Sequence, residues 1–194
     1  MRNTLITAFL LIIQVIAPKV IFAQLNDPLQ DKIVIVVHMQ KNNNKEDTSS
    51  VKIPVEIEKI NQIVISTDTS MVLYAKAMHK ILNLTLKKIY VEESIIDLDN
   101  RIEVVNNNIF IDHGGNIFSS KELLQFIDNK NIKQIVIVGR VAEDCITKSC
   151  IEGKKLGYDI FIVPEAIMGK SDEKSKTKAI NKLKAKGIKV LSGV

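Results

Sequence analysis

The 194-residue sequence contains only two cysteines, Cys145 and Cys150. If both lie on one helix, their five-residue separation places them about 7.5 Å apart along the axis and about 140° apart around it. A disulfide does not tolerate the resulting Cα separation, so we expect no intrachain disulfide. Two unpaired thiols remain, and each is expected either to be buried or to have a chemical role.

The sequence also lacks the motifs and the charge of a protein that binds nucleotides or nucleic acids. No Gly-x-Gly-x-x-Gly motif follows the first strand-like run, and no phosphate-binding loop occurs. The formal net charge of +5 is small and scattered along the chain. We therefore expect neither a nucleotide cofactor nor a nucleic-acid partner.

The first 23 residues have the pattern of a secretory signal peptide. Arg2 precedes the apolar run "LITAFLLIIQVIA", and Ala23 offers a small residue for cleavage. The run is too short and interrupted for a membrane span, although an uncleaved anchor remains an alternative. Because residues 1–23 contain Arg2, Lys19 and no acid, cleavage lowers the formal charge from +5 to +3. We expect an exported protein, periplasmic or secreted, with one domain over residues 24–194.

Strand-like runs alternate with helical patterns along this domain. The strand-like runs cover residues 32–37, 87–91, 134–139, 158–163 and 187–192, and the helical patterns cover 55–67, 69–85, 119–130, 144–157 and 171–187. The middle strand-like runs are continuously apolar, as in strands that are buried on both faces. The sequence therefore predicts a three-layer α/β fold, with a mostly parallel sheet covered by helices on both faces.

Several chemically active side chains follow the expected strands. His38 comes directly after "IVIVV", and the turn that holds Cys145 comes after "QIVIVG". Asp112 and His113 follow a short apolar run and precede a glycine pair. Because parallel strands end at the same edge of a sheet, we expect these residues to converge there.

The motifs around these residues resemble the isochorismatase-like cysteine hydrolases, the superfamily that includes nicotinamidases. The resemblance covers residues 32–194, and four segments carry it: "VVHMQK", "DHGGNIFSSKELLQF", "VGRVAEDCI" and "GKKLGYDIFIVPEAIMG". Cys145 lies six residues after Gly139, which is the spacing of the nucleophile in the family pattern. Asp112 lies six residues before Phe118, at the position of the family lysine.

Two of the three catalytic positions depart from the family pattern. His38 stands where the family has aspartate, and Asp112 stands where it has lysine. The thiol is retained, and a histidine and a carboxylate are the other parts of a Cys-His-Asp relay. In this relay His38 takes the thiol proton, and Asp112 orients the imidazole. Asp-His-Gly-Gly also reads as an ordinary turn, and a shift of one residue would place His113 in the site instead of Asp112.

Cys145 is predicted to lie in the first turn of its helix, where the dipole and unpaired N–H groups favour an anion. Backbone N–H groups near Ala142 and Cys145 are candidates for an oxyanion hole. The family resemblance further implies a cis peptide between Val141 and Ala142. Cys150, on another face of the helix, is interpreted as a small core residue.

We predict no metal and no cofactor. By resemblance, nicotinamidases hold zinc with an aspartate and two histidines between the first strand and the catalytic lysine. That interval contains no Asp-x-His pair here, and His79 stands alone in it.

Two functions follow from the sequence. The first is an exported hydrolase that opens a small amide or a related C–N or C–O bond through a Cys145 acyl-enzyme. The second is an inactive binding or scaffold protein with the same fold, since the family aspartate and lysine are both replaced. A small molecule is the expected partner of the hydrolase, and the sequence leaves open which one it is and whether the chains form a homo-oligomer.

Overall fold

The computed structural model describes residues 27–41, 53–85, 88–170 and 172–194. The predicted signal peptide, the start of the mature chain and the polar run 41–50, apart from Lys41, lie outside these residues. Within them, no helix is long and apolar enough to cross a membrane.

The strands form one sheet that is parallel except for a single pair. Its order is β3-β2-β1-β5-β6-β7, with β4 paired to β2. The strands are β1 (Ile33–Val37), β2 (Val72–Thr85), β3 (Lys88–Ile95), β4 (Ile109–Asp112), β5 (Gln134–Arg140), β6 (Asp159–Met168) and β7 (Lys189–Val190). Every residue of β1 is buried, as expected for an apolar strand in the middle of a parallel sheet.

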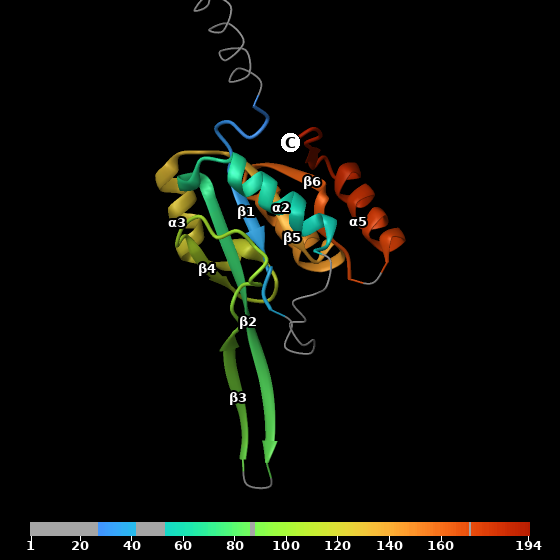
Figure 1. Ribbon diagram of the computed structural model, residues 1–194. Coiled ribbons are helices and arrows are strands. Elements are labelled where there is room, and N and C mark those ends of the chain that lie inside the picture. Colours follow the sequence, from blue (N-terminus) through green and yellow to red (C-terminus); the bar gives the residue numbers. More distant parts are fainter. Residues whose placement is uncertain (1–26, 42–52, 86–87, 171) are drawn as a thin grey trace, which may run out of the picture.

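Helices cover both faces of the sheet, which confirms the predicted three-layer fold (Figure 1). Alternate residues of β1 and β5 point into two separate cores. One core contains residues of α2, and the other contains residues of α3, α4 and α5. These helices are α2 (Val55–Ser66), α3 (Lys121–Lys130), α4 (Thr147–Lys155) and α5 (Glu173–Ala185).

The helix predicted over residues 69–85 is wrong, because most of this segment forms β2. Its first half pairs in parallel with both β1 and β4, and Val72–Ala75 are buried between them. The local helical spacing is overridden by this pairing, which buries four consecutive residues on both faces of the sheet. His79, expected on a helix, instead lies exposed on β2.

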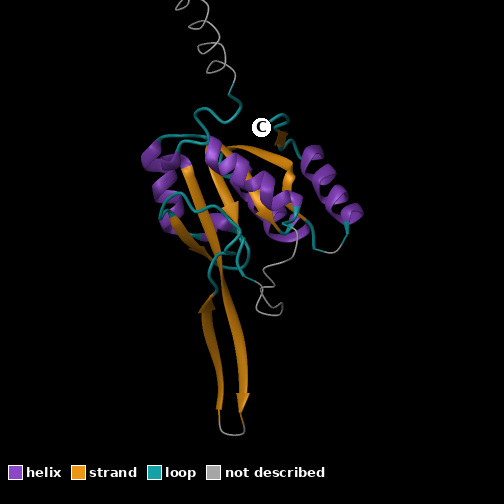
Figure 2. Ribbon diagram, in the orientation of Figure 1, coloured by secondary structure: helices purple, strands orange, loops and turns teal. Residues whose placement is uncertain are grey.

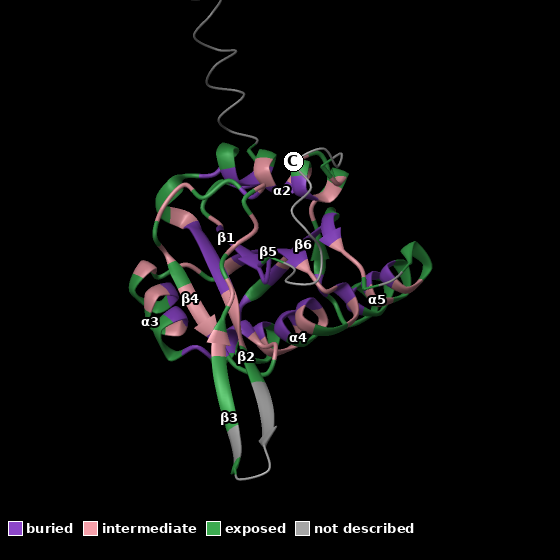
Figure 3. Ribbon diagram, turned by 60° about the horizontal axis from the view of Figure 1, so that its bottom comes forward, coloured by how far each residue is buried: buried purple, intermediate pink, exposed green. Residues whose placement is uncertain are grey.

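The second half of β2 pairs antiparallel with β3 and forms a hairpin that projects from the domain (Figures 2 and 3). Lys80 and Glu93 face each other across it in an exposed ion pair of 2.8 Å. The hairpin carries none of the predicted site residues.

The helix ends follow ordinary capping rules. The Ser120 side chain caps α3 by accepting from the Leu123 N–H. Asp172 is the N-cap of α5, where its carboxylate accepts from the Ser175 N–H. Gly157 and Gly187 have φ values of 88° and 76° and follow the ends of α4 and α5.

Candidate active site

The sheet brings the three predicted site residues to one edge. His38 follows β1, Asp112 ends β4, and Cys145 lies in the turn after β5. Val37 pairs with Ala75 on one side and Gly139 on the other, and Ala77 pairs with Asp112. Because these strands run in parallel, their carboxyl ends lie together, which is where ligands bind in such sheets.

His38 and Asp112 form a buried pair. His38 Nε2 and Asp112 Oδ2 are joined by a short hydrogen bond, and the two residues are 6% and 1% exposed. His38 has a φ of 52°, in the left-handed region that residues other than glycine rarely adopt. The second oxygen, Asp112 Oδ1, is buried and has no hydrogen-bond partner among the described residues. A buried oxygen without a partner is suited to accept a hydrogen bond from an N–H or O–H group of a bound molecule.

The surroundings of His38 favour its charged form. Burial alone would lower the pKa of His38, but hydrogen bonds with Asp112 and Cys145, and the charges of both groups, raise it from 6.5 to about 9. At neutral pH the His38 ring is therefore an imidazolium. A charged His38 is the form that results when the ring takes the thiol proton, as the predicted relay requires.

Cys145 lies in a single π-helical turn, Ala142–Ile146, that leads directly into α4. The thiol is partly exposed, and it lies close enough to His38 to contribute to the raised pKa of that ring. An imidazolium next to a cysteine sulfur favours the thiolate, which is the nucleophilic form. Single π-helical turns within helices occur frequently at functional sites.

The cis peptide of this turn lies one residue earlier than expected. It joins Arg140 and Val141, whereas the resemblance implied Val141 and Ala142. Pairing with β6 continues through Arg140, opposite Met168, so the chain leaves the strand at the Arg140–Val141 peptide. The part played by Ala142 and its neighbours as an oxyanion hole stays a prediction.

Two supporting residues were missed by the sequence analysis. Arg140 donates from Nε to the His38 carbonyl and from Nη2 to the Gln40 carbonyl, both at 3.0 Å. The Gln40 side chain in turn binds the Ala77 N–H and the carbonyls of Ala77 and Ile96. Gln40 belongs to the family motif after the first strand, so its retention was the available signal.

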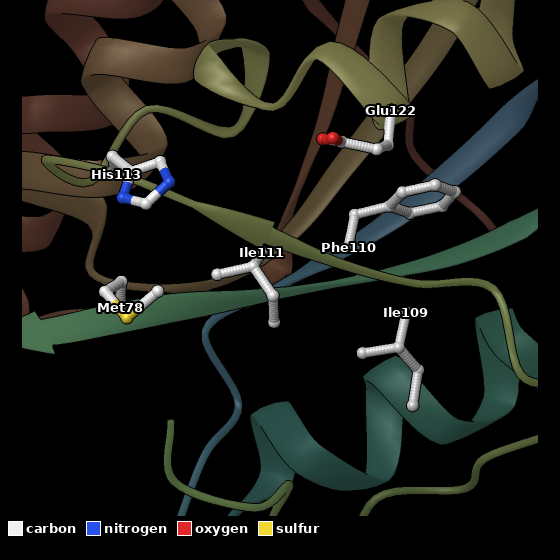
Figure 4. Close-up of a pocket in the computed structure, with 6 residues that line it drawn as sticks. All are labelled: Met78, Ile109, Phe110, Ile111, His113 and Glu122. Carbon is white, nitrogen blue, oxygen red and sulfur yellow. The ribbon is translucent and has the colours of Figure 1, made fainter. Parts of the chain in front are cut away.

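His113 does not share the position of Asp112. It lies beside a pocket of about 310 Å³ on β4, together with Glu122 of α3 and Met78 of β2 (Figure 4). This pocket is lined by neither His38 nor Cys145. The open choice between Asp112 and His113 is thus resolved geometrically in favour of Asp112, which pairs with His38.

The two cysteines are free and differ in environment. Cys150 is fully buried in the core, and this burial raises the pKa of its thiol to about 12. A buried thiol that stays protonated is a packing residue, in agreement with the interpretation from the sequence.

Within residues 27–41, 53–85, 88–170 and 172–194, no group of three or more His, Cys, Asp or Glu side chains is placed to hold a metal ion.

The isochorismatase domain model matches residues 20–193, so the chain belongs to the isochorismatase family. Yeast nicotinamidase bound to nicotinaldehyde is 15% identical, with a TM-score of 0.56 over 84% of this chain and 100% of that chain. Pyrococcus horikoshii pyrazinamidase in complex with zinc is 16% identical, with a TM-score of 0.60 over 84% and 99%.

A third structure, YcaC from Pseudomonas aeruginosa with hexane-2,5-diol and covalent acrylamide, is 14% identical, with a TM-score of 0.60 over 84% and 76%. At these identities the structures show a shared fold. No curated protein sequence matches the chain.

Proposed function

We propose that this isochorismatase-family protein is an exported cysteine hydrolase that opens a small amide or a related C–N or C–O bond. The observation that carries the proposal is the position of His38, which forms a buried hydrogen bond with Asp112 and lies close enough to Cys145 for that group to raise the His38 pKa. The names of the structurally similar nicotinamidase and pyrazinamidase denote amide substrates, which supports this bond class.

In the proposed reaction, the resting site holds a Cys145 thiolate and a His38 imidazolium. The thiolate attacks the substrate carbonyl, and a tetrahedral intermediate forms. As it collapses, His38 gives its proton to the leaving nitrogen or oxygen, and the acyl group stays on sulfur as a thioester. Neutral His38 then takes a proton from water, the resulting hydroxide attacks the thioester, and the carboxylic acid leaves. The thiolate and the imidazolium are thereby restored.

Asp112 keeps the imidazolium in place during this cycle, because it holds Nε2 from a buried position. The other ring nitrogen is then left to serve the sulfur and the leaving group. Removing the general acid–base group of such a relay costs roughly 10²- to 10⁴-fold in rate.

Incubation with nicotinamide and pyrazinamide, followed by acid quenching and mass spectrometry, tests this reaction. We expect an acyl adduct on Cys145, loss of turnover in Cys145→Ala, and a large loss in His38→Ala. Cys150→Ala is the matched control, since Cys150 lies in the core and should keep turnover. Failure of both amides and of a wider panel of small amides and esters would contradict the proposal.

An inactive binding protein is the second candidate, and one observation favours it. The described pocket of Figure 4 lies on β4 and is not lined by Cys145. Alkylation by iodoacetamide separates the two candidates. Fast modification of Cys145 at neutral pH that is suppressed in His38→Ala supports the hydrolase, whereas two equally inert cysteines support the binding protein.

The export part of the proposal rests on the sequence of residues 1–23. N-terminal sequencing of the protein recovered from its native cells tests it. A mature chain that starts near Gln24 supports export with cleavage, and an intact Met1 contradicts cleavage.

A further inference from the structure

Lys148 and Cys145 both approach the Gly114–Gly115 turn, although Lys148 belongs to the following turn of the helix. Its ammonium forms an ion pair of 2.7 Å with Asp144 and donates to the Gly114 carbonyl at 3.4 Å.

The Gly114–Gly115 turn is held between this ammonium and the sulfur. A Cβ atom on Gly115 would lie 3.1 Å from Cys145 Sγ and 3.8 Å from Lys148 Nζ. The sulfur and the ammonium therefore both lie near Gly115, and a Cβ atom there would require the sulfur to shift by a few tenths of an ångström. Gly115 also has a φ of 75°, which L side chains rarely adopt.

The charge around the sulfur comes from two pairs on different elements. His38 and Asp112 form the buried pair, and Lys148 and Asp144 form a second pair on the helix that carries Cys145. The hydrogen bond with Asp144 raises the pKa of Lys148, and the neighbouring Cys145 adds a smaller contribution in the same direction. Lys148 is consequently cationic at neutral pH.

We propose that Lys148 is a positioning residue for Cys145, which holds the Gly114–Gly115 turn against the sulfur and adds a second positive charge beside the thiolate. The inference rests on the proposed role of Cys145 as the nucleophile. The proposed cation comes from α4, and the sequence motifs did not indicate a cation on this helix.

Alkylation of Cys145 tests this role without any substrate. The rate is measured by mass spectrometry of the Cys145 peptide, against pH, with neutral iodoacetamide and with anionic iodoacetate. The variants are Lys148→Met and Lys148→Arg. Lys155→Met is the matched control, because Lys155 lies on the same helix and forms a comparable pair with Glu152 at 3.1 Å.

In Lys148→Met we expect the rise of the alkylation rate to move to higher pH. The iodoacetate rate should also fall about threefold further than the iodoacetamide rate at low ionic strength, and less at high salt. Lys148→Arg should restore most of both effects, since it keeps the charge. Thermal unfolding of each variant confirms that it is folded.

Identical profiles for Lys148→Met and Lys155→Met would overturn the role of Lys148 and leave the proposed hydrolase intact. A wild-type Cys145 that reacts no faster than Cys150 would instead contradict the nucleophile itself, and the role of Lys148 with it.

Discussion

Replacing Asp112 with asparagine tests whether this carboxylate sets the charge of His38. The Asp112→Asn variant keeps the shape of the side chain and removes the negative charge that binds His38 Nε2. Because burial lowers the pKa of His38 and Asp112 contributes the largest opposing effects, we expect the pKa to fall from about 9 to near or below 6.5. The His38 ring would then be a neutral imidazole at physiological pH.

The same shift couples folding to pH. His38 has a higher pKa in the folded chain than in the unfolded one, so its stabilising contribution is complete below pH 6.5 and is lost as the pH rises through about 9. One pKa unit corresponds to about 1.4 kcal/mol. The free energy of unfolding of the wild type, relative to Asp112→Asn, should therefore fall by on the order of 3 kcal/mol across this window.

An NMR titration of the histidine rings and urea unfolding at several pH values check these two expectations. The His79→Gln and His113→Gln variants assign the ring signals. Asp128→Asn is the matched control, since its carboxylate accepts from the Tyr158 hydroxyl at 3.2 Å, away from the site. Two results would refute the reasoning. One is a His38 signal that still titrates near pH 9 in Asp112→Asn, and the other is a free energy of unfolding that changes equally with pH in the wild type and in Asp112→Asn.

Three further outcomes test the packing and the thiols. Phe118→Ala should cost about 3–5 kcal/mol in urea unfolding, because Phe118 is buried and stacks on a tyrosine ring. Gly139→Ala should prevent folding or cost more than about 3 kcal/mol of stability, since its Cβ would lie 2.3 Å from a backbone oxygen. Gly114→Ala places its Cβ in open space and should cost about 1 kcal/mol. Equal losses of stability in thermal unfolding of the two variants would contradict this. After brief peroxide exposure, mass spectrometry should find sulfenic acid on Cys145 before Cys150, and the reverse order would mean that the active edge is misplaced.

The sequence predicts well those strands whose environment is uniform. β1 and β5 are buried on both faces, so their continuous apolar runs carry a clear signal. β2 does not have one environment, because its first half is buried between two strands and its second half projects into solvent. A local pattern averages over both halves, which is why the segment was assigned to a helix.

The convergence of the candidate site residues at one edge of the sheet could be predicted from the sequence, whereas the charge of His38 could not. Strand ends and motif spacing identify His38, Asp112 and Cys145 without any knowledge of side-chain contacts. The charge of His38 depends on the balance between burial and two hydrogen bonds, and no spacing in the sequence reports that balance. The position of the cis peptide was likewise missed by one residue. It follows the last residue of β5 that pairs with β6, and the sequence does not report where that pairing ends.

The two departures from the family pattern compensate each other electrostatically. By resemblance, the family has an acid at position 38 and a base at position 112, and this chain has the base at His38 and the acid at Asp112. Either replacement alone would leave an uncompensated buried charge, at a cost of roughly 3–5 kcal/mol, whereas the two together restore a neutral pair. Stability of the fold is therefore sufficient to explain why His38 and Asp112 occur together, and their pairing alone is weak evidence for catalysis. The discriminating feature is the electrostatic interaction of His38 with Cys145, because a purely structural pair has no need of the thiol. For this reason the suppression of Cys145 alkylation in His38→Ala carries more weight for the proposed function than any measurement of stability.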